Sequence, residues 1–163
     1  MKTKWLLLPA LFILASQIAL SLEVGDPAPP FVNPDCNKQF VWSRDYLAKD
    51  WVVVDIFATD CEGCKKELPI LEQLLSDFTE TGLTIFVLAT DAEGDSVVGP
   101  YFRENPTTLT ILVDRYQVAV KKYQVTEIPS LFLVDPLGDI VFKEVGFQPD
   151  LYERISAVLN QDQ

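Results

Sequence analysis

The chain has 163 residues, enough for one domain with a sizeable core, and its formal net charge is −11. This acidic balance argues against nucleic acid as a partner and against docking on anionic lipid headgroups, because both need basic side chains to neutralise phosphates. The sequence has no histidine, which excludes Ser-His-Asp hydrolysis, Cys-His proteolysis and His-ligated copper, haem or iron.

Residues 1–21 have the organisation of an export signal. Lys2 and Lys4 form a positively charged start, and residues 5–15 form an apolar run. Small residues stand at the minus-three and minus-one positions of a cut after Ser21. We therefore expect residues 1–21 to be a cleaved signal peptide.

An uncleaved anchor over residues 5–22 is the alternative, although this span barely reaches the length that a bilayer requires. In both cases the domain of residues 22–163 is exported, since the lysines stay inside. The bacterial periplasm is the expected location, and the domain is bound to the membrane only if the first segment is retained.

The first part of the domain is expected to have little regular structure. Residues 22–37 carry four prolines and should form an extended segment. Residues 40–42 are expected to add an edge strand. Ser43 is expected to N-cap a short helix that ends at Ala48.

The centre of the sequence predicts a buried strand followed by a helix. Residues 51–57 are short, apolar and β-branched, as is typical of a strand buried on both faces. From Lys65 onward, apolar residues recur at spacings of three and four, which indicates a helix: Leu68, Leu71, Leu74, Leu75 and Phe78. Pro69 is expected to bend this helix, and Gly82 to end it.

The second half predicts alternating strands and helices. The expected elements are a strand over 83–89, an acidic loop over 90–100 leading into a short helix, a strand over Thr110–Val113, a helix over 116–123, strands over Ser130–Val134 and Ile140–Val145, and a last helix from Pro149. This order indicates the α/β class, with a central mixed β-sheet covered by helices on both faces.

Cys61 and Cys64 stand where the buried strand passes into the helix N-terminus. This end of a helix has unpaired N–H groups and a partial positive charge, which favour a thiolate. A thiolate attacks disulfides, and a second cysteine nearby can resolve the mixed disulfide that forms. A zinc site would need two more ligands, and only Cys36 remains, while a purely structural bridge would close a very small loop. Redox chemistry without a metal or organic cofactor is the favoured interpretation.

Two segments in register with the buried strand carry a family resemblance: Cys61-Glu-Gly-Cys64-Lys-Lys-Glu-Leu-Pro69 and Glu127-Ile-Pro129-Ser-Leu-Phe-Leu-Val-Asp-Pro-Leu-Gly138. The chain resembles the thioredoxin-like superfamily, and most of all the exported thiol:disulfide oxidoreductases of the TlpA/ResA type, which assist cytochrome c maturation. The resemblance covers residues 24–163 and implies a thioredoxin fold.

The resemblance also implies a role for each residue of the site. Cys61 is the attacking nucleophile and Cys64 the buried resolving thiol of a redox-active disulfide. Asp55 matches a buried aspartate that takes the proton of the resolving cysteine; the alternative is a strand residue paired with a lysine. Pro129 matches a proline with a cis peptide bond that lies against the cysteines; the alternative is a trans proline that begins an edge strand. Ile128 beside it is expected to contact the substrate.

Glu62 and Gly63, between the cysteines, are further expected substrate contacts. Gly63 stands where the family commonly has proline, and Asp60 where it commonly has an aromatic residue. The carboxylates of Asp60 and Glu62 oppose thiolate formation at Cys61, and two lysines, Lys65 and Lys66, partly offset them.

Three residues outside the motif are assigned more general roles. The family also uses an acidic residue near the site after the second strand. Asp91 and Glu93 lie in that region, and ordinary loop acidity is the preferred interpretation for both. Cys36 is interpreted as a buried bystander, and a regulatory or intermolecular thiol is the alternative.

The predicted function is reduction of protein disulfides outside the cytoplasm, with electrons from a membrane-bound or other extracytoplasmic thiol donor. Two alternatives stay open. A peroxiredoxin-like peroxidase would place threonine or serine three residues before its cysteine, where this chain has Ala58. A non-enzymatic copper- or thiol-binding module would use Cys61 and Cys64 as soft ligands.

Overall fold

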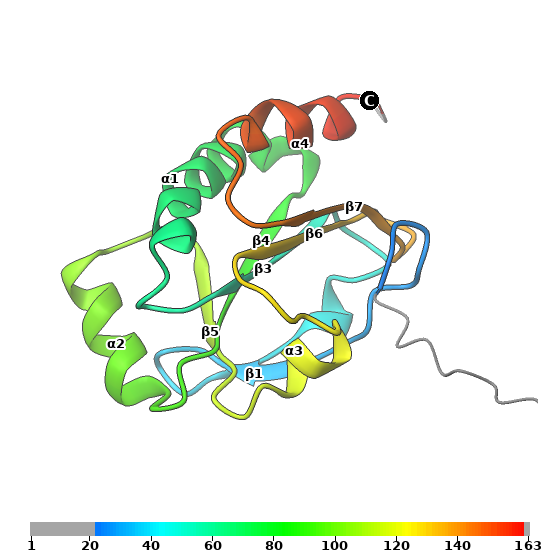
Figure 1. The fold of residues 1–163 in the computed structure, drawn as a ribbon. Coiled ribbons are helices and arrows are strands. Elements are labelled where there is room, and N and C mark those ends of the chain that lie inside the picture. Colours follow the sequence, from blue (N-terminus) through cyan, green and yellow to red (C-terminus); the bar gives the residue numbers. More distant parts are fainter. Residues whose placement is uncertain (1–21, 162–163) are drawn as a thin grey trace, which may run out of the picture.

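The computed structural model describes residues 22–161, which form a five-stranded sheet with helices on both faces (Figure 1). The strand order is β5-β4-β3-β6-β7. β3 (Val52–Phe57) is central and runs parallel to β4 (Thr84–Ala89), which is parallel to β5 (Thr110–Val113). β6 (Ser130–Val134) is antiparallel to β3, and β7 (Ile140–Val145) to β6. The mixed sheet predicted from the sequence is confirmed.

Three helices cover one face of the sheet: α1 (Glu62–Asp77), α2 (Asp95–Glu104) and α4 (Leu151–Leu159). Figure 1 shows α1 and α4 side by side along this face. The opposite face packs against α3 (Val118–Lys122) and the N-terminal segment. That segment contains β1 (Val32–Pro34), β2 (Phe40–Trp42) and the short η1 (Ser43–Asp45), while η2 (Thr79–Thr81) follows α1.

Alternation along β3 separates the two cores and places one carboxyl in the apolar interior. Val53 and Phe57 pack with the leucines of α1, whereas Ile56 faces the core that contains Tyr123. Successive side chains of a strand point to opposite faces, so Asp55 shares the face of Val53 and Phe57. β3 therefore carries an acid directly beneath α1.

Several local predictions need correction. α1 begins at Glu62 rather than Lys65, so Cys61 is its N-cap residue. Ser43 is not an N-cap, because its hydroxyl accepts a hydrogen bond from the Phe31 N–H at 2.8 Å and donates one to the Phe31 carbonyl at 3.1 Å. β1 was not predicted, because its pairing with β2 depends on a hairpin that short-range patterning does not reveal.

The predicted export segment, residues 1–21, lies outside the described residues. Across residues 22–161, none of the helices is both long enough and apolar enough to pass through a membrane.

Candidate active site

The Cys61–Cys64 pair lies at the start of α1 as a disulfide, with the two Cα atoms 5.3 Å apart. Cys61 is half-buried, whereas Cys64 is fully buried. The Cys64 N–H donates a hydrogen bond to Cys61 Sγ at 3.1 Å. In the reduced protein, this N–H and the helix N-terminus favour negative charge on the Cys61 sulfur. Accessibility and hydrogen bonding thus fit Cys61 for attack and Cys64 for resolution.

Two of the four charged residues around the motif, Glu62 and Lys65, pair with each other. Lys65 Nζ lies 2.7 Å from Glu62 Oε1 at the protein surface. This contact lowers the pKa of Glu62 and raises the pKa of Lys65. Lys66 lies 5.8 Å from the ring centre of Phe147. Because Glu62 shares the charge of Lys65, this lysine offsets the acidic residues beside Cys61 less than a free cation would.

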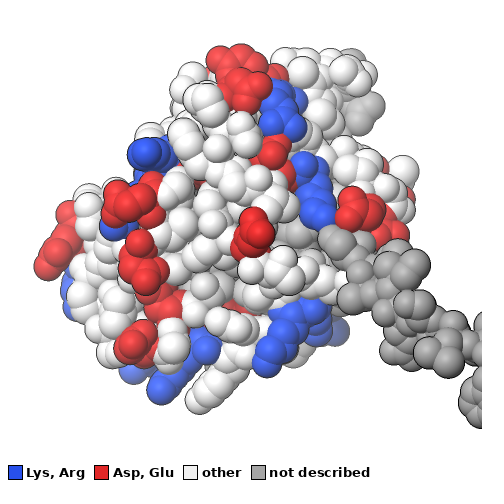
Figure 2. Space-filling view, in the orientation of Figure 1, with Lys and Arg blue, Asp and Glu red and all other residues white. Residues whose placement is uncertain are grey.

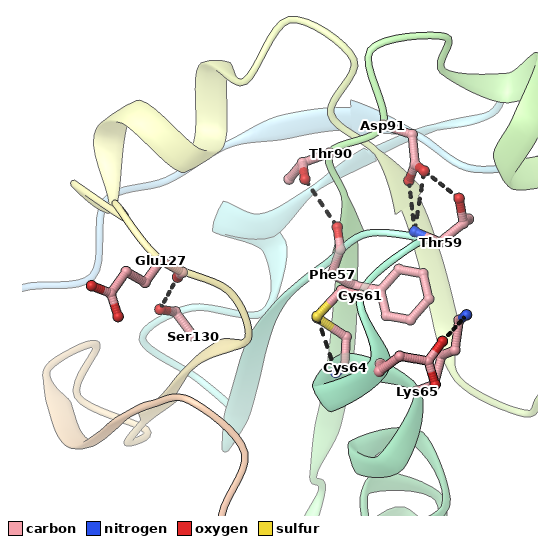
Figure 3. The surroundings of a disulfide bond; sticks show 10 residues. Phe57, Thr59, Cys61, Cys64, Lys65, Thr90, Asp91, Glu127 and Ser130 are labelled. Atoms are coloured by element: carbon pink, nitrogen blue, oxygen red, sulfur yellow. Dashed lines mark hydrogen bonds and ion pairs between the residues drawn. A yellow bond between two sulfur atoms is a disulfide. The ribbon is translucent and has the colours of Figure 1, made fainter.

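Pro129 closes the site from the opposite side of the motif. The Ile128–Pro129 peptide bond is cis, so the alternative of a trans proline is wrong. The Gly146 N–H donates to the Pro129 carbonyl at 2.8 Å, which fixes the loop to the end of β7. Ser130 Oγ donates to the Glu127 carbonyl at 2.6 Å and closes the turn that contains the proline (Figure 3). Ile128 is exposed beside it.

Asp91 holds the loop that precedes Cys61. Its carboxylate accepts hydrogen bonds from the Thr59 N–H, at 3.1 Å, and from the Thr59 hydroxyl (Figure 3). Asp91 follows β4, and Thr59 follows β3, so the contact joins the ends of two parallel strands. The interpretation of Asp91 as ordinary loop acidity is therefore wrong. Glu93 is exposed and follows the expectation for a surface residue.

Asp55 is fully buried, and its electrostatic neighbour is Glu67 of α1, which is only 1% exposed. On the sheet, Asp55 lies between Val87 and Leu131. The alternative of a lysine partner is therefore wrong. Burial raises the pKa of both carboxyls, and negative charge on Asp55 raises that of Glu67 further. The two groups form a buried pair that holds a proton more strongly than free carboxyls do.

Glu67 was not identified from the sequence. It stands three residues after Cys64, so both lie on one face of α1. That face continues through Leu71 and Leu74, which are fully buried. The signal in the sequence that could have identified Glu67 was an acidic residue within an otherwise apolar stripe of the helix.

Cys36 is a free, half-buried thiol. Burial raises its pKa, and the nearby carboxylates of Asp95 and Asp35 raise it further, while Arg103 acts in the opposite direction. Within residues 22–161, no cluster of three or more acidic or cysteine side chains could hold a metal ion.

Thiol–disulfide exchange requires an accessible sulfur that attacks and a protected sulfur that resolves the intermediate. The described site offers both on a sheet with the strand order expected of a thioredoxin fold. The class that fold and site define is therefore the thioredoxin-like dithiol proteins.

The chain belongs to the AhpC/TSA family, which matches residues 24–143. Among curated proteins it is similar to the thiol-disulfide oxidoreductase ResA of Bacillus thuringiensis subsp. konkukian, with 28% identity over 127 residues that cover 78% of this chain and 72% of the relative. The ResA of Bacillus subtilis is 28% identical over 121 residues, which cover 74% of this chain and 66% of that protein.

A solved structure of a putative thiol:disulfide interchange protein DsbE from Chlorobium tepidum superposes with a TM-score of 0.79 at 25% identity, covering 86% of this chain and 98% of that one. The thioredoxin domain of a thiol-disulfide oxidoreductase from Bacteroides vulgatus gives a TM-score of 0.75 at 29% identity, covering 86% of this chain and all of that domain (100%). These similarities confirm the predicted thioredoxin fold and the class of thiol:disulfide oxidoreductase.

Proposed function

We propose that the chain is an exported thiol:disulfide oxidoreductase that reduces protein disulfides, with Cys61 as nucleophile and Cys64 as resolving thiol. The observation that carries the proposal is the unequal burial of the two sulfurs at one helix N-terminus. A substrate disulfide can reach Cys61, whereas the buried Cys64 can react only with the Cys61 sulfur of the mixed disulfide.

The reaction follows from this asymmetry. The Cys61 thiolate attacks one sulfur of a substrate disulfide, the substrate S–S bond breaks, and one substrate thiolate leaves. Cys64 loses its proton and attacks Cys61, which breaks the mixed disulfide and releases the second substrate thiolate. Two electrons pass from the cysteine pair to the substrate, and a thiol donor must then reduce the Cys61–Cys64 disulfide again.

The proton of Cys64 goes to the buried carboxyl pair in this proposal. Cys64 and Glu67 lie one helical turn apart, and Asp55 is next to Glu67 beneath the helix. A carboxyl with a raised pKa is a better base for a thiol than a free carboxylate, because its conjugate acid is weaker. Asp55 therefore acts as the proton acceptor, and Glu67 supports it.

Substrate contacts are proposed for the exposed groups around Cys61. Glu62 is exposed within the Cys61–Cys64 loop, Ile128 is 38% exposed beside Pro129, and Gly63, which has no side chain, packs against Pro129. The partners are protein thiols and disulfides, and the expected donor is a membrane-bound or other extracytoplasmic thiol. Acidic and basic groups are interspersed on the face in Figure 2, with no continuous basic area on it.

The extracytoplasmic location is proposed from two observations. Residues 1–21 have the pattern of an export signal, and the curated relatives are named ResA, the type to which the sequence resemblance pointed. A periplasmic reductant for cytochrome c maturation fits both.

The reduction potential of the Cys61–Cys64 couple tests the direction of electron flow. Protein with Cys36→Ser, which leaves two thiols, is equilibrated in thiol redox buffers and read by gel shift with a maleimide. A value near the thioredoxin end, roughly −270 mV, supports a reductant, and a value near −120 mV, roughly that of a strong oxidant, reverses the direction. Rapid consumption of hydrogen peroxide by the reduced protein would favour the peroxidase alternative instead.

A further inference from the structure

A third carboxyl lies on the α1 face of the sheet. The strand register pairs Asp55 of β3 with Leu131 of β6, and Leu131 with Glu144 of β7. Directly paired residues share a face of a sheet, so Glu144 lies on the face of Asp55, two strands away. Burial raises the pKa of Glu67, and negative charge on Asp55 and then on Glu144 raises it further. We call Asp55, Glu67 and Glu144 the carboxyl row.

The outer member of the carboxyl row is held by a cation. Arg154 of α4 forms an ion pair with Glu144 and lies 5.0 Å from the ring centre of Phe142. The Arg154 side chain is 40% exposed and that of Glu144 only 14%, so the pair extends from the surface inward. Asp150, on the same side, is 4.0 Å from Arg154. The row therefore has its counter-charge at its solvent-exposed end.

We propose that the Glu144–Arg154 ion pair is a further positioning element of the thiol–disulfide reaction: it sets the charge beside Glu67 and so controls how readily the buried carboxyls accept the proton of Cys64. This inference rests on the proton role proposed above for Asp55 and Glu67. Glu144 and Arg154 touch neither sulfur and act only through the carboxyl pair.

The affected step is resolution of the mixed disulfide. The Cys64 S–H bond breaks, the proton moves to the ionised member of the Asp55–Glu67 pair, and the Cys64 sulfur attacks Cys61 while the substrate thiolate leaves. Negative charge at Glu144 makes the pair harder to ionise, and positive charge at Arg154 makes it easier. Removal of one partner must therefore have the opposite effect to removal of the other.

This opposition separates an electrostatic role from a structural one. Glu144→Gln and Arg154→Gln break the same ion pair, so a merely structural contribution would change both variants in the same way. An electrostatic contribution changes them with opposite signs. The double variant, which removes both charges, should return toward the wild type.

The experiment follows the two chemical steps in the full domain with Cys36→Ser. Reduced protein is mixed with a chromogenic aryl disulfide in a stopped-flow instrument. Attack by Cys61 releases the first coloured thiolate, and attack by Cys64 releases the second, so the second phase reports the step of interest. The rate of that phase is measured as a function of pH for each variant, and thermal unfolding confirms that each variant is folded.

We expect Glu144→Gln to move the midpoint of the second phase to lower pH and Arg154→Gln to move it to higher pH. Arg154→Lys should keep the wild-type midpoint because it keeps the charge. Glu23→Gln is the matched control, because it removes the carboxylate of another ion pair on β7. Glu23 Oε1 lies 3.0 Å from the Nζ of Lys143, which is on the same strand as Glu144.

Shifts of the same sign in the two Gln variants, or unchanged midpoints in both, would overturn the inference. Asp55→Asn and Glu67→Gln, measured alongside, separate this result from failure of the proposed proton role. If these two variants alter the second phase while Glu144→Gln and Arg154→Gln do not, the proton role stands and the positioning role of the ion pair is wrong. If none of the four variants alters the second phase, the proton role and the positioning role are both wrong.

Discussion

Gly63 packs directly against Pro129: a Cβ at position 63 would lie 3.2 Å from the proline Cδ and 3.4 Å from the Cβ of Phe147. The motif glycine is thus the point where α1 meets the cis-proline loop. Any side chain at this position must displace one of these neighbours, which include the loop that faces the substrate.

Gly63→Val is therefore expected to lower the unfolding free energy of the oxidised protein by about 1–3 kcal/mol, the usual cost of overpacking. Urea unfolding provides the measurement. Glu62→Val is the matched control, because it places the same β-branched side chain at the neighbouring exposed helical position. Equal unfolding free energies of the two variants would contradict the prediction, because they would show that the Pro129 loop moves aside without loss of stability.

The buried carboxyls should make the fold less stable as the pH rises. Asp55 and Glu67 titrate near pH ~4 in an unfolded chain, and burial raises the pKa of both in the folded protein. Between these values the folded protein keeps protons that the unfolded chain releases. Their stabilising contribution is thus complete below about pH 4 and is lost as the pH rises through the raised folded values.

We expect the unfolding free energy of the oxidised protein to fall from about pH 5 to about pH 9, and Glu67→Gln to flatten the fall by about 1.4 kcal/mol for each unit of pKa shift removed. Urea unfolding at several pH values measures the slope. Glu153→Gln, on the exposed side of α4, should keep the wild-type slope. A wild-type stability that is flat over this range would contradict the prediction.

Asp91 should contribute to stability and to the reactivity of Cys61 through its hydrogen bonds to Thr59. Asp91→Ala leaves the Thr59 N–H and hydroxyl without their acceptor, and loss of hydrogen bonds to a charged group costs about 1.5–3 kcal/mol. We expect this loss in urea unfolding, together with slower attack by Cys61, since Thr59 stands two residues before Cys61. Thr59→Val keeps the N–H bond and should cost less. Glu93→Ala, an exposed acid in the same loop, should match the wild type.

The parts of the fold that could be predicted depend on short-range patterns. β3 is a continuous apolar run, the Cys61–Cys64 spacing lies at a strand–helix boundary, and the segment from Glu127 to Gly138 carries its own turn chemistry. Each of these features is visible within about twelve residues. For this reason the central strand and the cysteine pair were identified correctly from the pattern, and the segment from Glu127 to Gly138 carried the family resemblance that implied the cis proline.

The missed features depend on contacts between distant segments. Glu67 becomes a site residue only because its face of α1 meets Asp55, and Asp91 only because β4 lies next to β3. A glutamate in a helix and an aspartate in a loop are most often solvated, so Asp91 was interpreted as ordinary loop acidity and Glu67 was not singled out. Strand order and helix orientation were needed to separate these two acids from Glu93.

Cys36 should react much more slowly than Cys61 in the reduced protein. Burial and the carboxylates of Asp95 and Asp35 raise the pKa of the Cys36 thiol, whereas Cys61 lies at the N-terminus of α1, which favours the thiolate. We expect alkylation by iodoacetamide near neutral pH to be at least about tenfold slower at Cys36, as measured by peptide mass spectrometry over time. In urea the difference should shrink, because both environments are lost. Equal rates in the folded protein would contradict the assignment of Cys36 as a bystander.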